Sequence, residues 1–173
     1  ICTAQVLLAI IAGMYGVYHG PKGIKAIAER IHLFTKYLDN LLGKLGYVQS
    51  NKNYFDTLLI KLDDKSNKLL SEIKTLALKH QINFRYADDS SISISLNECT
   101  EINDVLEIVQ IFASAAGKEI KEELLLKDFT SIKIELPLFC NRTTSFMMHP
   151  VFNTYQSETE MMRYMKRLEN KDL

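Results

Sequence analysis

The spacing of apolar residues changes along the chain, and this change constrains the fold more than any other feature. From Tyr54 the apolar interval becomes two, the period of a strand. Before that point, apolar residues recur at intervals of three and four, as on one face of a helix: Ile24, Ile27, Ala28, Ile31, Leu38, Leu41 and Leu45. The pattern therefore predicts helices followed by a sheet, an α+β fold.

The N-terminal residues form an apolar run from Val6 to Tyr18. The run is too short to cross a bilayer, which needs about 20 apolar residues, and no basic region precedes it. We therefore expect a buried helix that starts at or before residue 1, in a chain cut from something larger. Gly20 and Pro21 should end this helix, and Pro21 suits the start of a second helix that ends at Gly46.

The middle of the chain predicts a small, mainly antiparallel sheet with helices packed on one face. Its alternating segments predict a strand largely buried on both faces and then a hairpin, and Thr100 can cap the following helix. Residues 119–129 fit a short helix or a loop, and 131–136 fit a last strand. In order, the predicted elements are a strand at 54–62, a helix to about His80, a hairpin at 82–96, and a helix with the stripe Val105, Ile108, Val109 and Phe112.

The tail combines an apolar-rich loop at 143–156 with a helix at about 158–169. Ser157 and Glu160 match a capping box, and the helix carries a methionine-rich apolar stripe. Such a tail either docks against other material or folds back to complete the core of this domain. We therefore divide the chain into a helical segment at 1–46, a small α+β domain at 47–140 and a loop and helix at 141–173.

Charge and cysteine content exclude several kinds of partner. The chain has 21 Lys and Arg against 21 Asp and Glu, so it lacks the positive field that favours nucleic acids or anionic membranes. Its three cysteines are scattered and have no histidine at ligand spacing. This arrangement indicates reduced thiols in a reducing compartment, with neither a disulfide framework nor a metal site.

Few residues suggest chemistry by themselves. His149 is the best histidine candidate, because it precedes a proline in a loop where a pocket could form. His32 and His80 are expected on solvated faces. Arg85 fits either a surface ion pair or an anion contact. The chain has no phosphate-binding glycine motif and no nucleophile motif, so local chemistry alone reveals no activity.

Several longer blocks carry a family resemblance. They occur in one collinear order over essentially the whole chain: Ile1-Cys-Thr-Ala-Gln5, Val17-Tyr-His-Gly20-Pro, Tyr54-Phe-Asp-Thr57, Ile82-Asn-Phe-Arg85, His149-Pro-Val-Phe-Asn153, Ser157-Glu-Thr-Glu-Met-Met-Arg-Tyr-Met165 and Leu168-Glu-Asn-Lys-Asp172. In these blocks the chain resembles the P-protein family of the glycine cleavage system, the decarboxylating glycine dehydrogenases.

The resemblance implies part of a pyridoxal-phosphate enzyme of fold-type I, which resembles aspartate aminotransferase. The family's enzymes decarboxylate glycine and pass the aminomethyl group to the lipoyl arm of the H-protein. This chain resembles the end of the first of two homologous halves and the connection to the second half, which carries the cofactor lysine. The resemblance thus implies no catalytic, cofactor-binding or metal residue here, an inactive fragment, and the second half, H-protein and another copy of the full enzyme as partners.

The resemblance also marks residues for an active-site junction or an interface. At the N-terminus these are Cys2, Thr3 and Gln5, for which helix packing is as good an interpretation as catalysis. The remaining positions are Arg85, His149, Asn153, Ser157, Glu158 and Arg163. The α+β order alone also permits a free-standing regulatory or interaction module. Reduced cysteines suit the bacterial cytoplasm first and the mitochondrial matrix second.

Overall fold

The chain divides into two compact units, which the computed structural model describes over residues 3–62, 68–119, 129, 132 and 140–171. Unit 1 combines residues 1–28 with 136–173, and unit 2 comprises residues 29–135. The helix or loop predicted at 119–129 and the strand predicted at 131–136 lie almost entirely outside the described residues. Each unit is described by itself below.

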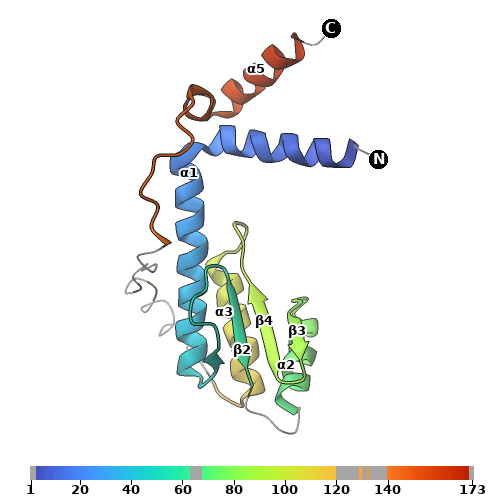
Figure 1. Ribbon diagram of the computed structural model, residues 1–173. Coiled ribbons are helices and arrows are strands. Elements are labelled where there is room, and N and C mark those ends of the chain that lie inside the picture. Colours follow the sequence, from blue (N-terminus) through green and yellow to red (C-terminus); the bar gives the residue numbers. More distant parts are fainter. Residues whose placement is uncertain (1–2, 63–67, 120–128, 130–131, 133–139, 172–173) are drawn as a thin grey trace. The chain divides into compact units, whose positions relative to one another are not determined.

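Helix α1, Thr3–Lys44, is interrupted at Gly20 (Figure 1). Gly20 has φ 60° and ψ −178°, a conformation that is essentially open only to glycine, and Pro21 follows it. The predicted break between two helices is therefore confirmed. The helix ends before Gly46, whose φ of 92° again needs a glycine and whose amide donates to the Gly43 carbonyl at 2.9 Å.

Unit 2 contains an antiparallel sheet of four strands in the order β1-β2-β4-β3. Strand β2 pairs with β4 so that Leu58 faces Ile94 and Ile60 faces Ile92. The described elements are β1 (Val48–Gln49), β2 (Thr57–Lys61), α2 (Lys68–Lys79), β3 (Arg85–Asp88), β4 (Ser91–Ser95) and α3 (Ile102–Ala115). The predicted α+β fold and the predicted hairpin, β3 with β4, are confirmed.

The hydrophobic core of unit 2 lies between one face of the sheet and its helices. Alternate residues of β2 and β4 point into this core, where α2 and α3 cover the same side of the sheet (Figure 1). The core also takes in the second half of α1. Its fully buried members include Tyr37, Leu38, Leu58, Ile60, Ile73, Ile92, Val105, Val109 and Phe112.

Two local predictions about unit 2 need correction. Strand β2 is fully buried on one face only, because Thr57 on its second face is partly buried and bonds Ser95 through the two hydroxyls at 2.9 Å. Thr100 does not cap α3. The N-cap residue is Glu101, whose amide donates to Asp104 Oδ2 at 2.8 Å, while the Thr100 hydroxyl accepts from the Asn97 amide at 3.1 Å.

Unit 1 contains the first part of α1, a 3₁₀ turn η2 (Pro150–Asn153) and helix α5 (Glu158–Glu169). The capping box predicted at Ser157 is confirmed in its first half, because the Ser157 hydroxyl accepts from the Glu160 amide at 3.3 Å. The Ser157 hydroxyl also donates to Glu160 Oε2 at 3.2 Å. These contacts fix the start of α5 at the predicted residue.

Candidate functional site

The loop before α5 is held by side chains that bond its own backbone. His149 caps η2, because its Nδ1 accepts from the Val151 amide at 3.2 Å. The Asn153 amide group donates to the Met147 carbonyl at 3.1 Å and to the His149 carbonyl at 3.3 Å. Met147 itself has a φ of 52°, uncommon for a residue with a side chain. These bonds hold the loop in one defined shape.

Two glycines of α1 let this loop approach the helix closely. A Cβ added at Gly16 would lie 3.6 Å from Met147 Cε and 3.7 Å from the Phe152 ring. At Gly20 a Cβ would lie 2.6 Å from the Phe152 carbonyl oxygen and would also overlap the Gln156 amide. Gly20 therefore meets two requirements at once, an unusual backbone conformation and room for the chain that returns from η2.

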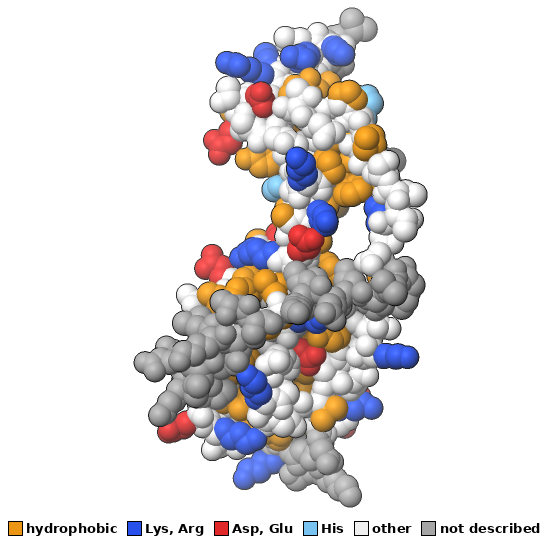
Figure 2. All heavy atoms as spheres, turned by 90° about the vertical axis from the view of Figure 1, so that its left-hand side faces the viewer, with side chains coloured by type: hydrophobic (Ala, Val, Ile, Leu, Met, Phe, Trp, Pro, Cys, Tyr) orange, Lys and Arg blue, Asp and Glu red, His pale blue; other side chains and the backbone are white. Residues whose placement is uncertain are grey.

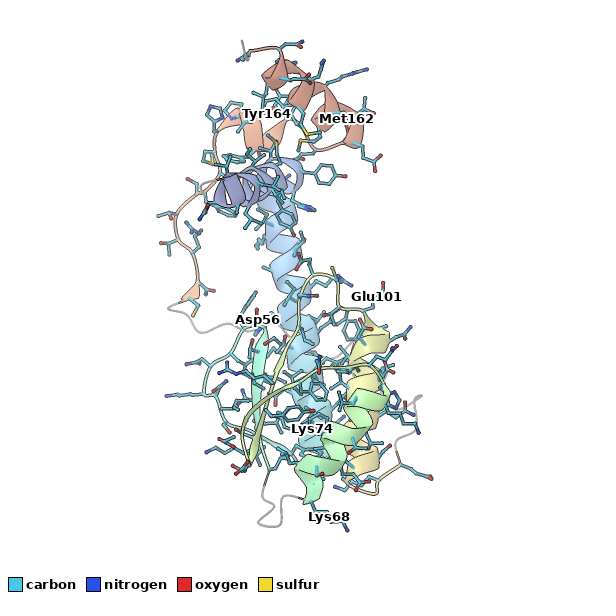
Figure 3. The ribbon with its side chains drawn as sticks, turned by 90° about the vertical axis from the view of Figure 1, so that its right-hand side faces the viewer. Asp56, Lys68, Lys74, Glu101, Met162 and Tyr164 are labelled. Carbon is cyan, nitrogen blue, oxygen red and sulfur yellow. The ribbon has the colours of Figure 1, made fainter. Side chains whose placement is uncertain are left out.

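Helix α5 is joined to the loop through an aromatic pair. Tyr155 stacks on Tyr164 with 4.2 Å between ring centroids and 13° between ring planes. Arg167 donates to the Tyr155 hydroxyl at 3.1 Å, and its guanidinium lies 5.8 Å from the centre of that ring. Tyr164 and Met162 lie on α5 in Figure 3.

Most of the methionine-rich surface of α5 is open to solvent. Met161 is 9% exposed, whereas Met162 is 67% exposed. Met148, Met165 and Leu168 are exposed as well. Figure 2 shows hydrophobic side chains at the surface of unit 1, with Lys and Arg side chains beside them. This combination is typical of an adaptable docking surface.

The structure brings together only some of the residues that the sequence marked. His149, Asn153 and Ser157 share the loop that leads into α5, and Glu158 and Arg163 follow on the exposed side of α5. Gln5 is exposed on α1, the side chain of Thr3 is not described, and Cys2 lies outside the described residues. Arg85 begins β3, in unit 2. Within the described ranges, no three His, Cys, Asp or Glu residues gather as a metal site.

Sequence reasoning missed a polar cluster on α1 in unit 2. His32 was expected on a solvated face, but it is only 3% exposed: its Nδ1 bonds the Phe55 carbonyl at 2.8 Å, and its ring stacks on Phe55. The Tyr54 hydroxyl donates to Asp39 Oδ2 at 2.6 Å. The only available signal was the four-residue spacing of His32 from Ala28 on an otherwise apolar stripe.

Burial is the main cause that raises the pKa of Tyr54 well above its usual value. The hydrogen bond to Asp39 and the negative charge of that carboxylate raise it further. The tyrosine is therefore a fixed hydrogen-bond donor near neutral pH. This cluster holds segment 54–56 against α1 and has no arrangement of nucleophile and base.

Another missed residue, Arg30, fastens the loop before α3 to α1. Its guanidinium donates to the Glu98 and Thr100 carbonyls, at 2.8 Å each. The same group lies 5.0 Å from the centre of the Phe34 ring. His80, expected on a solvated face, is indeed exposed and bonds Glu107 at 2.8 Å.

Comparison with known proteins supplies the family. The family model described as "Glycine cleavage system P-protein" matches residues 1–112. The chain is 47% identical over 173 residues to the glycine dehydrogenase (decarboxylating) of Flavobacterium johnsoniae, and 45% identical over 173 residues to that of Bacteroides fragilis. A relative with the same name from Nostoc sp. is 48% identical over 179 residues.

All three comparisons cover 100% of this chain, but the chain spans only 17–18% of the length of these relatives. No helix among the described residues is long and apolar enough to span a membrane. The family match covers well over half of the chain, and the resemblance over the whole chain is confirmed. The chain therefore belongs to the glycine cleavage system P-protein family.

Proposed function

We propose that this chain is part of a glycine decarboxylase, a P-protein that acts on glycine with pyridoxal phosphate and passes the aminomethyl group to the lipoyl H-protein. The main support is the identity of 45–48% to proteins named glycine dehydrogenase (decarboxylating) over the full length of the chain. In this proposal, residues 47–140, most of which lie in unit 2, form the small domain of a fold-type I half. The division at 1–46, 47–140 and 141–173 belongs to the same proposal.

The described residues of this chain do not fit a pyridoxal-phosphate site. The cofactor needs a lysine for its Schiff base inside an enclosed pocket, with an acidic or basic partner for its ring nitrogen. The buried polar and charged residues of the described chain are His32, Thr35, Ser91 and Thr100, and no described lysine is buried. We therefore assign the cofactor lysine to other polypeptide, and the isolated chain should be inactive.

The proposed role of the chain is to form a junction. His149 and Asn153 hold the loop, Ser157 fixes the start of α5, and Glu158 and Arg163 present charges on its exposed surface. Gly20 positions the first part of α1 against this loop. In the proposal, the second half of the P-protein receives this surface, and the full enzyme forms homo-oligomers.

We also propose a location in the bacterial cytoplasm. Cys99 and Cys140 are exposed, and exposed thiols suit a reducing compartment. The relatives named above come from bacteria.

A chimera tests the proposed function. The matched region of the Flavobacterium johnsoniae protein is replaced by this chain, and glycine-dependent exchange of labelled bicarbonate is measured. We expect the chimera to keep at least a tenth of the exchange rate of the unaltered relative. A folded chimera that retains pyridoxal phosphate but shows no exchange would contradict the proposal.

The isolated chain is the matched control. It should neither catalyse exchange nor retain stoichiometric pyridoxal phosphate after gel filtration, as measured by the visible absorbance of the cofactor. Retention through one of its own lysines would contradict the assignment of the cofactor site to other polypeptide. A free-standing module would instead bind an amino acid or a partner by itself and would not restore exchange in the chimera.

A further inference from the structure

The first part of α1 is not buried as the sequence predicts, and it carries the largest run of exposed apolar side chains in the described chain. We call residues 4–19 the N-terminal arm. Its exposed members are Val6, Leu7, Leu8, Ile10, Ile11 and Tyr15. The arm has no charged residue, since the first Lys, Arg, Asp or Glu of the sequence is Lys22. A helix that permanently faces water normally carries a charged or polar face.

The large apolar residues extend around more than half of this helix. Since an α-helix turns about 100° per residue, Val6, Ile10, Leu7, Ile11 and Leu8 together cover about 200° of its circumference. The opposite side carries small residues, among them Ala9, Ala12, Gly13 and Gly16. The loop of unit 1 already packs against that side, because Met147 and Phe152 lie next to Gly16.

The width of the apolar surface indicates whether the arm packs against one helix of a second copy or is surrounded by polypeptide on several sides. Contact with one neighbouring helix, such as the same helix of a second copy, needs an apolar stripe only slightly wider than about 100°. Such a contact would leave several large side chains of the arm in water. A helix that is apolar around its circumference is instead typical of a protein core.

We propose that the N-terminal arm is a core helix of a longer polypeptide, enclosed on several sides by the P-protein sequence that lies outside this region. The relatives provide the length for this enclosure, because the chain spans 17% of the Flavobacterium johnsoniae protein. The partner surface is apolar and concave and belongs to the same polypeptide. This inference rests on the proposed function and names the surface through which the chain joins the whole enzyme.

The same chimera tests the enclosure through hydrogen exchange. Backbone amides of the arm should exchange at least a hundredfold more slowly in the chimera than in the isolated chain, because neighbours on several sides suppress opening of the helix. Amides of α3, which is already packed in unit 2, provide the internal control and should change little. Equal exchange of the arm in the two proteins would overturn the proposal.

Leu7→Asp provides the second test, with Leu78→Asp as its matched control. The two leucines are similarly exposed, at 61% and 58%, but Leu78 lies on α2 beside Lys74 and Thr75. In the isolated chain, both substitutions should leave the unfolding midpoint unchanged. In the chimera, Leu7→Asp should lower the yield of soluble folded protein at least tenfold, whereas Leu78→Asp should not.

Light scattering and activity separate the remaining outcomes. An isolated chain that forms a defined dimer, lost on Leu7→Asp, would assign the arm to a second copy and overturn the proposal. An active chimera that tolerates Leu7→Asp would also overturn it, while the proposed function would stand. A chimera with a protected arm and no bicarbonate exchange would contradict the proposed function alone. A chimera that cannot fold with the unaltered arm would show that the surrounding polypeptide does not fit it.

Discussion

Tyr54 links a single contact to the pH dependence of stability. Burial first, then the hydrogen bond to Asp39 and its charge, raise its pKa above the ordinary value of 10.0. In the unfolded chain this tyrosine loses its proton from about pH 10, while the folded chain keeps it. Because the unfolded state then binds fewer protons, the free energy of unfolding should be constant below that pH and fall as the pH rises above it.

Urea unfolding at pH 8 and pH 11 measures this decline. Tyr54→Phe should reduce the difference between the two pH values, because the substituted residue has no proton to lose. Some decline should remain, since burial also raises the pKa of Tyr47 to about 12. An unchanged pH dependence in the Tyr54→Phe variant would show that the contact with Asp39 does not hold this proton.

Replacing Gly20 should destabilise unit 1. Gly20→Ala should destabilise unit 1 by about 2 kcal/mol or more, because alanine is strained at this backbone conformation and its Cβ would meet the Phe152 carbonyl. Gly13→Ala is the control. No atom lies within 4 Å of its Cβ position, so it should stabilise the helix by about 0.5–1 kcal/mol. Two measurements distinguish the variants: the free energy of unfolding from chemical denaturation, and the rate of amide hydrogen exchange in residues 4–19.

The stability of helix α5 depends on the hydrogen bonds that cap its first turn. Ser157→Ala removes the acceptor for the Glu160 amide and should cost about 1 kcal/mol of local helix stability. Faster amide exchange in the first turn of α5 would report this loss. Ser114→Ala, at an exposed position inside α3, should be neutral or slightly stabilising. Equal effects of the two substitutions would contradict the capping role.

The strands show why alternation of apolar residues predicts where a strand lies but not how far each of its faces is buried. Alternation placed β2 and the β3–β4 hairpin, because a strand turns successive side chains to opposite faces. It could not reveal what covers the second face of β2. Leu59 is apolar, but its neighbours across the strand pair are serines, and it is only partly buried. The burial of a strand face depends on neighbours that are distant in sequence.

Because the chain divides into two compact units, we expect a substitution in one unit to affect the stability of that unit alone. Ile92 is fully buried in the sheet of unit 2, so Ile92→Ala should destabilise that unit by about 2–5 kcal/mol. Met161 is the buried residue of α5 in unit 1, and Met161→Ala should instead accelerate exchange in α5. Hydrogen exchange resolved by segment checks both. A single cooperative response of both units to either substitution would contradict separate cores.

Only some roles of the residues in and around the candidate site could be predicted from the sequence. Ser157 was predictable because a capping box is a local pattern within four residues. His149 was marked because of its proline neighbour, but its actual contact, a cap on η2, depends on the conformation of the loop. His32 and Arg30 act on residues 23 and about 70 positions away, so their sequence neighbours do not reveal their contacts. The four-residue spacing of His32 from Ala28 indicates at most which side of the helix His32 occupies.

The sequence alone predicted the break at Gly20, the family, and the order of the helices and of strands β2, β3 and β4, because these depend on short-range sterics, apolar period and matching blocks. It did not predict the two-residue strand β1. Tertiary structure alone decided which apolar surfaces are covered. Ile60 and Ile10 are both isoleucines in regular elements, yet Ile60 lies in a core and Ile10 faces solvent. Burial is a property of the surrounding chain, and no residue determines its own surroundings.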